Sequence, residues 1–143
     1  MRIALASDHA GFELKEFLKG FLGELGHQVD DLGTTGTASV DYPDFAKAAC
    51  RRVLDGAAER AILVCGSGVG MSMAANRFKG IRAVLCADLY IAKFSRLHND
   101  ANVLCLPGRL MGKGLAEEVC RTWLGTPFEG GRHARRLEKL ETD

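Results

Sequence analysis

The alternation of short apolar runs with longer amphipathic segments most constrains how this chain can fold. The apolar run 2–7 precedes a segment, 11–26, in which apolar residues recur every three or four positions, as on one face of a helix. Further apolar runs stand at 27–33, 60–65, 80–87 and 101–108. Because strands separated by helices pair in parallel, this alternation predicts a five-stranded parallel sheet with helices on both faces.

Residues that start and end helices support the same division. Gly26 is placed to end the first helix, and Asp41 to cap the second, with Pro43 in its first turn. The last expected helix is strongly charged and has a thin apolar face, so we expect it to pack on a partner subunit. The helices after the second are expected at 71–78, 88–98, 110–124 and 131–141.

Length and composition predict one domain without nucleic-acid or membrane partners. The 143 residues suffice for one domain with a buried core, and a net charge of +1 gives no field that would attract nucleic acid or an anionic membrane. No apolar run approaches a membrane span, and the N-terminus lacks the cleavage site of a signal peptide. Five cysteines without a C-x-x-C pair argue against disulfides and a zinc site, and favour reduced thiols in the cytoplasm.

Polar residues gather where the expected strands end, which is where ligands bind in open parallel sheets. This position makes each of them a candidate site residue, which scattered polar residues would not be. After the first three strands the candidates are Ser7, Asp8, His9, Asp41, Tyr42 and Cys65. Further candidates are His98, Asn99 and Asp100, which end the helix after the fourth strand, and Gly108 and Arg109, which follow the fifth.

The glycine-rich loop LVCGSGVGMS, residues 63–72, has a cysteine at its entrance. A Walker loop would need Gly at position 71 and a cysteine-phosphatase loop Arg, but that residue is Met, and G-x-G-x-G is not the dinucleotide spacing. What remains is a turn whose backbone N–H groups face negative charge and favour a thiolate. On position alone, Cys65 is equally a packed small residue or a reactive thiol. The other cysteines are expected in the core: Cys50, Cys86, Cys105 and Cys120.

Five longer motifs follow one another along the chain: SDHAGF, DYPDFA, CGSGVGMSMAANRFKGIRAVLC, SRLHNDANVLCLPGR and WLGTPFEGGRHARR. Together they span nearly the whole chain, and they resemble the ribose-5-phosphate isomerase B family, which includes isomerases of allose and galactose phosphates. The resemblance implies a Rossmann-like three-layer sandwich around a five-stranded parallel sheet. It also implies a homodimer or dimer of dimers with active sites shared between subunits, and no metal or other cofactor.

The same resemblance implies interconversion of ribose 5-phosphate and ribulose 5-phosphate through a cis-enediol. It assigns Cys65 as the base that moves a proton between C2 and C1, since Cys65 with Met71 is the pattern of the cysteine branch of the family. It assigns His98 to opening the sugar ring with help from Asp8, and Ser67 to orienting the substrate or the thiol. The implied substrate-binding residues are His9, Asp41, Tyr42, Gly66, Gly68, Val69, Gly70, Asn99, Arg109, Arg132 and Arg136.

The resemblance also implies which part of the substrate each of these residues binds. The backbone of 66–70 forms the anion hole for the enediolate, which Asn99 also holds. His9 and three arginines bind the phosphate, for which guanidinium groups are well suited. His133 receives no defined role. The three arginines are Arg109, Arg132 and Arg136.

The sequence is compatible with other functions. The substrate can be a six-carbon sugar phosphate such as allose 6-phosphate, because pocket depth is not visible in sequence. A nucleotide-binding Rossmann module without chemistry is a rival from another class, which the failed fingerprints disfavour. Without the resemblance, His98 would more often be a helix cap, and the cluster of Arg132, Arg135 and Arg136 a solvated helix face.

Overall fold

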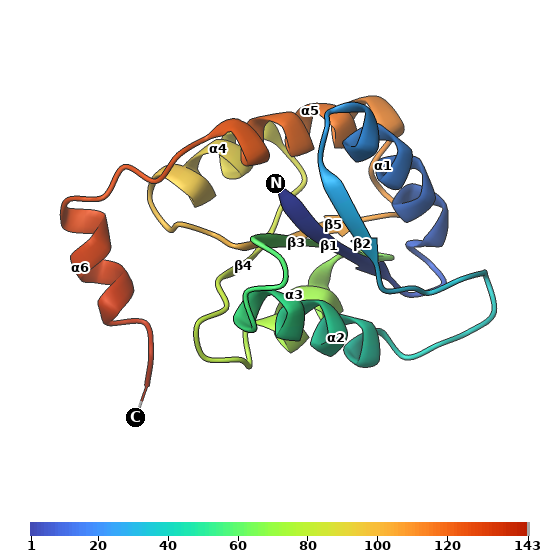
Figure 1. Cartoon of the computed structure of the whole chain (residues 1–143), viewed down its shortest axis with the longest axis horizontal. Helices are drawn as coiled ribbons and strands as arrows, with labels where there is room; N and C mark the ends of the chain where they lie inside the picture. Colours follow the sequence, from blue (N-terminus) through green and yellow to red (C-terminus); the bar gives the residue numbers. More distant parts are fainter. Residues whose placement is uncertain (143) are drawn as a thin grey trace.

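Five parallel strands form one sheet in the computed structural model, which describes residues 1–142 (Figure 1). The structure confirms the predicted Rossmann-like α/β fold with its five-stranded parallel sheet. The fourth strand is shorter than expected, and the fifth lies between the third and the fourth. Across the sheet the order is β2 (Gln28–Asp31), β1 (Arg2–Ser7), β3 (Arg60–Cys65), β5 (Val103–Pro107) and β4 (Ala83–Leu85).

Helices cover both faces of this sheet, and the last helix lies apart from them (Figure 1). One face carries α1 (Phe12–Glu24), α4 (Leu89–Leu97) and α5 (Lys113–Gly125), and the other carries α2 (Tyr42–Leu54) and α3 (Val69–Ala75). The helix α6 (Arg132–Glu138) stands beyond the end of the sandwich, on the side of α4. Among residues 1–142, none of the helices has the length and apolarity needed to cross a membrane.

The strand side chains alternate between two cores, as the two-residue period of a strand requires. Large residues such as Ile62 and Val64 face α1 and α5, where Trp123 is fully buried. Smaller residues such as Ala61 and Cys65 face α2 and α3. Cys65 therefore points toward the layer that holds the glycine loop and the start of α2.

A buried ion pair ties α1 to β2. The Lys15 side chain is fully buried, and its Nζ donates to both carboxylate oxygens of Asp31, at 2.8 and 2.9 Å. Asp31 also accepts from the backbone N–H of Gly33 at 3.0 Å, and Gly33 in turn accepts from the N–H of Ser7 at 2.8 Å. This network fixes the end of β1, immediately before Asp8.

Candidate active site

An open cavity of about 400 Å³ lies at the carboxyl ends of the central strands. Strand β1 has β2 on one side and β3 on the other, so the connections leave in opposite directions at this point. Open α/β sheets bind their ligands at such a reversal. The cavity brings together eight of the predicted site residues: Asp8, His9, Tyr42, Cys65, Gly66, Ser67, Gly70 and Arg109.

Cys65 closes strand β3 at the floor of this cavity. It pairs in register with Pro107 of β5, and its carbonyl oxygen accepts from the N–H of Gly108 at 2.8 Å. The side chain is only 4% exposed, yet it lines the cavity. A thiol held in this way reaches a small bound molecule while remaining shielded from bulk water.

The other cysteines are all buried and free, as expected. Burial raises the pKa of Cys50 to about 11, and mainly burial raises that of Cys120 to about 12. Burial likewise raises the pKa of Cys105 well above its usual range and, partly offset by a backbone contact, that of Cys86. These thiols stay protonated near neutral pH, so their position suits packing and not chemistry.

Asp8 and His9 are held by backbone contacts at the end of β1. One carboxylate oxygen of Asp8 accepts from the N–H groups of Ala10, at 3.0 Å, and Gly11, at 3.1 Å. His9 Nδ1 accepts from the N–H of Val40 at 3.2 Å. A neutral His9 that accepts at Nδ1 carries its proton on Nε2, which makes that nitrogen a donor suited to an anion.

The glycine loop is shaped by what packs against it. The Arg109 side chain lies over Gly66, where a Cβ would come within 3.3 Å of Nη1. Gly68 has a φ of 79°, and a Cβ there would lie 2.6 Å from Leu85 Cδ1, so glycine is required. Of the loop N–H groups, that of Val69 already donates to Ser67 Oγ at 3.2 Å.

His98 belongs to a second group, at the opposite edge of the sheet. His98 directly follows α4. Two residues later, the carbonyl oxygen of Asp100 accepts a hydrogen bond from the guanidinium of Arg82, which precedes β4. The His98 ring stacks on that of His133, with centroids 4.1 Å apart and planes 11° apart. Burial, together with His98 and Arg132, lowers the pKa of His133.

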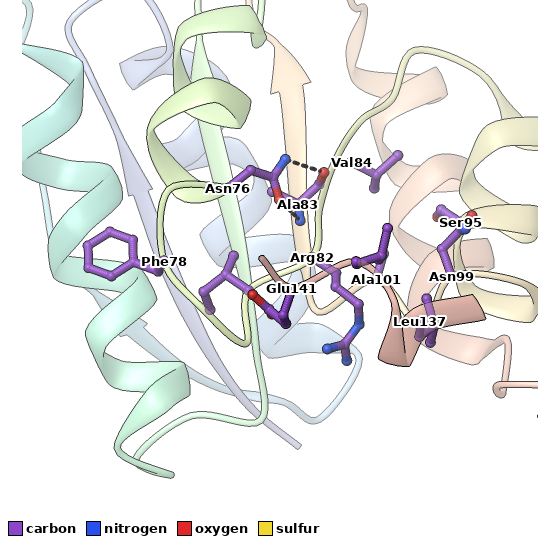
Figure 2. Close-up of a pocket in the computed structure, with 12 residues that line it drawn as sticks. Asn76, Phe78, Arg82, Ala83, Val84, Ser95, Asn99, Ala101, Leu137 and Glu141 are labelled. Atoms are coloured by element: carbon purple, nitrogen blue, oxygen red, sulfur yellow. Dashed lines mark hydrogen bonds between the residues drawn. The ribbon is translucent and has the colours of Figure 1, made fainter. Parts of the chain in front are cut away.

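Asn99 lines another cavity, of about 430 Å³, between α6 and the edge strand β4. Figure 2 shows Asn99 beside Ser95 and Leu137, with Arg82 on the opposite wall. Gly68 and Val69 lie in the glycine loop at the start of α3 but do not line the Cys65 cavity, and three further predicted residues lie outside it. Asp41 is exposed at the N-cap position of α2 without a capping side-chain bond, and the two α6 arginines, Arg132 and Arg136, are exposed.

The sequence did not separate the residues of the Cys65 cavity from those at the end of α4. The reason is that a helix that follows a parallel strand returns to the amino edge of the sheet. The end of α4 is therefore far from the strand ends with which its sequence position grouped it. Glu129 was also missed: its Oε2 lies 3.7 Å from His98 Nε2 and its Oε1 3.9 Å from His133 Nε2. The spacing of Glu129 and His133, four residues apart, is the one signal that pointed to it.

Comparison with known proteins gives consistent matches over nearly the whole chain. Ribose-5-phosphate isomerase B of Escherichia coli (strain K12) is 45% identical over 139 residues, which cover 97% of this chain and 93% of the relative. The structure of Clostridium thermocellum ribose-5-phosphate isomerase B superposes with a TM-score of 0.97 at 47% identity, covering 98% of this chain and 95% of that one.

A third relative carries a different substrate in its name. D-erythrulose-4-phosphate isomerase of Pectobacterium atrosepticum is 39% identical over 142 residues, which cover 98% of this chain and 93% of the relative. The model of the Ribose/Galactose Isomerase family matches residues 3–140. This chain therefore belongs to the Ribose/Galactose Isomerase family and, with it, to the aldose–ketose isomerases.

Proposed function

We propose that this chain interconverts ribose 5-phosphate and ribulose 5-phosphate through a cis-enediol, with Cys65 as the base. The observation that carries the proposal is the placement of Cys65 in a cavity with Asp8, His9 and Arg109. Its relatives named as ribose-5-phosphate isomerases support ribose 5-phosphate as the substrate. The five free thiols fit an enzyme of the reducing cytoplasm.

Cys65 acts on the open-chain sugar. The thiolate removes the proton from C2 of the aldose, and the electron pair forms the C1–C2 double bond while the carbonyl oxygen at C1 becomes an enediolate oxygen. The same thiol returns the proton to C1, and transfer of the hydroxyl proton from the oxygen at C2 to the enediolate oxygen at C1 yields the ketose. Unoccupied N–H groups of the loop 66–70 and the start of α3 stabilise the enediolate oxygen.

The phosphate lies at the other end of the substrate. His9 Nε2–H and the Arg109 guanidinium line the cavity and supply donors to it. Tyr42 and the Asp8 carboxylate contact the sugar. Ser67, through its bond to the N–H of Val69, holds the loop rather than the substrate in this arrangement.

A second copy of the chain completes this site in our proposal. Four predicted residues do not line the Cys65 cavity of their own chain, and in this proposal they act in the cavity of the partner: His98, Asn99, Arg132 and Arg136. Two features support this assembly. The helix α6 stands off its own sandwich (Figure 1), and several large apolar side chains are exposed near the cavity. These are Val69, Met73, Leu85, Leu89, Tyr90 and Leu110.

The main alternative is a sugar phosphate with a different number of carbon atoms. The Pectobacterium relative is named for a four-carbon phosphate, so a shorter substrate joins the six-carbon candidate predicted from sequence. Isomerisation of the four-, five- and six-carbon substrates uses the same proton transfer and the same phosphate-binding residues. Relative kcat/KM values for ribose 5-phosphate, D-erythrulose 4-phosphate and allose 6-phosphate distinguish them, and the highest value identifies the substrate.

The deciding experiment compares Cys65→Ala with Cys50→Ala in an isomerase assay on ribose 5-phosphate. Loss of a positioned base costs roughly 10²–10⁴-fold in kcat, so Cys65→Ala should lose at least that factor. Cys50→Ala is the matched control, because Cys50 is a buried residue of α2 that does not line the cavity. Near-full activity of Cys65→Ala would remove Cys65 as the base.

The rival without chemistry predicts other results. A nucleotide-binding module would gain thermal stability with NAD or ATP and would not turn over any of the three sugar phosphates. Parallel melting curves with each sugar phosphate and each nucleotide therefore belong in the same experiment.

A further inference from the structure

Two imidazoles and one carboxylate converge where α6 begins, outside the Cys65 cavity. His98, Glu129 and His133 each offer a ligand atom, and these three atoms all lie within 4.8 Å of one another. They come from the end of α4, the loop before α6 and α6 itself. The Glu129 N–H donates to the carbonyl oxygen of Leu97 at 3.0 Å, which holds the carboxylate beside His98.

His133 supplies an independent reason to expect a ligand. Its side chain is more than nine-tenths buried, and its Nε2 has no hydrogen-bond partner within residues 1–142. A buried polar atom without a partner is unfavourable, and such atoms are rare in folded proteins. Because Nε2 faces Glu129 at 3.9 Å, a bound cation would satisfy both groups.

The spacing is close to that of a zinc centre. Zinc–nitrogen and zinc–oxygen bonds near 2.1 Å in a tetrahedron place neighbouring ligand atoms about 3.4 Å apart. The two contacts to Glu129 are 3.7 and 3.9 Å, so small side-chain movements close them. His98 must also turn out of its stack on His133, and its side chain, 37% exposed at the end of α4, has room to do so.

The ligand chemistry selects the class of metal. Imidazole suits zinc, copper and nickel, whereas magnesium and calcium prefer oxygen ligands. Two histidines with one glutamate also form a known zinc set that leaves a fourth position for water. The cluster therefore fits a divalent transition metal and not a hard cation.

We propose that His98, Glu129 and His133 bind Zn²⁺, and that the bound ion inhibits the isomerase by occupying His98. The inhibition rests on the proposed function, in which His98 Nε2 opens the sugar ring. A nitrogen that donates its lone pair to zinc cannot accept or deliver a proton. The isomerase itself needs no metal in this scheme, and zinc acts as a reversible inhibitor.

Calorimetric titration of the full chain with ZnCl₂ tests the binding. We expect about one zinc ion per chain, with affinity reduced by at least about tenfold in Glu129→Gln and in His133→Phe. Phenylalanine keeps the aromatic stack on His98 while removing the ligand nitrogen. Two matched controls should bind zinc normally: Glu118→Gln, an exposed glutamate on α5, and His27→Phe, a histidine that precedes β2 and bonds to the N-terminal amine.

Two further measurements distinguish zinc at this cluster from zinc bound elsewhere on the chain. Zinc binding should persist in Cys65→Ala, which excludes capture by that thiol. In the isomerase assay, zinc should inhibit the unsubstituted chain, and EDTA should restore activity. Zinc should inhibit Glu129→Gln much less, when each rate is compared with the same variant's rate without zinc.

The outcomes decide both parts of the proposal. Unchanged affinity in Glu129→Gln, or no saturable binding to the unsubstituted chain, would overturn the site. Zinc binding at this cluster without inhibition of the isomerase would overturn the proposed inhibition. A chain that shows no isomerase activity even with EDTA would contradict the proposed function, while the titration would still decide the zinc site.

Discussion

The phenol ring of Tyr42 lies against the backbone of Gly70, so that a Cβ on Gly70 would come within 2.8 Å of the ring carbons Cε2 and Cζ. Tyr42 begins α2 and Gly70 lies in the first turn of α3, so this contact joins two walls of the Cys65 cavity. The glycine at this position is therefore a matter of space, and not of backbone conformation.

Gly70→Ala should displace Tyr42 or the loop, and misplacement of site groups lowers kcat/KM by roughly 10²-fold. Gly20→Ala in α1 is the control, since a Cβ there meets nothing within 4 Å and alanine favours the helix. Steady-state kinetics and melting temperatures of both variants check this. An active Gly70→Ala enzyme would mean that Tyr42 does not shape the site.

A shared active site predicts complementation between two inactive variants. Cys65→Ala and His98→Asn should each be nearly inactive, but after unfolding and refolding together, mixed dimers carry one intact site. Random pairing should then restore roughly a quarter of the normal activity. Cys65→Ala mixed with Asp8→Asn should restore none, because both changes fall in the cavity of the same chain. Equal recovery in both mixtures would contradict a site built from two chains.

The arginines of α6 predict a split between KM and kcat. Arg136→Ala should raise KM for ribose 5-phosphate about tenfold or more, since a hydrogen bond to a charged group is lost, with a smaller effect on kcat. Arg135 is also exposed but lies on another side of the helix, so Arg135→Ala is the control. An unchanged KM in Arg136→Ala would remove this arginine from the phosphate site.

The buried cysteines predict selective alkylation. Burial raises the pKa of Cys50 to about 11 and, as the main cause, that of Cys120 to about 12, so at pH 8 both remain thiols and react slowly. Cys65 lines the cavity, so iodoacetamide at pH 8 should modify it first, and activity should fall at the same rate. Peptide mass spectrometry follows each site. Ribose 5-phosphate should protect Cys65, and labelling of Cys50 at a similar rate would contradict this ranking.

The pair of Lys15 and Asp31 predicts how stability changes with acid. Burial alone would raise the pKa of Asp31, but the bonds from Lys15, the Gly33 N–H and Lys19 outweigh it, and the pKa is lowered from its ordinary value of 3.8. A carboxylate with a lower pKa in the folded state stabilises the protein above its unfolded pKa. This contribution is lost as the pH falls below about 4 and through the folded pKa.

Asp31→Asn should therefore lower the free energy of unfolding at pH 7 by about 3 kcal/mol, because it leaves the Lys15 charge buried with one fewer partner. It should also flatten the dependence of stability on pH below about 4. Asp30→Asn is the control, since Asp30 pairs with Arg52 on the surface and contributes at most about 1 kcal/mol. Urea unfolding at pH 7 and at lower pH measures both.

Much of the fold was determined by the sequence alone. The alternation of apolar strands and amphipathic helices is a local pattern, and a parallel α/β sandwich is the arrangement that buries it. The residues that directly follow strands were also predictable: Asp8, Cys65 and Arg109 meet because the carboxyl ends of neighbouring parallel strands share one edge. The packing of the other four cysteines followed from their apolar surroundings in the same way.

Only the tertiary structure decided what lies at the ends of helices and beyond them. His98 ends the helix that follows β4, and α4 carries it back across the sheet, so no local pattern places it near His133. The buried charge of Lys15 was invisible for the same reason, because its partner Asp31 is on another element. Such contacts depend on where two distant segments meet in space, and that is set by the packing of the whole chain.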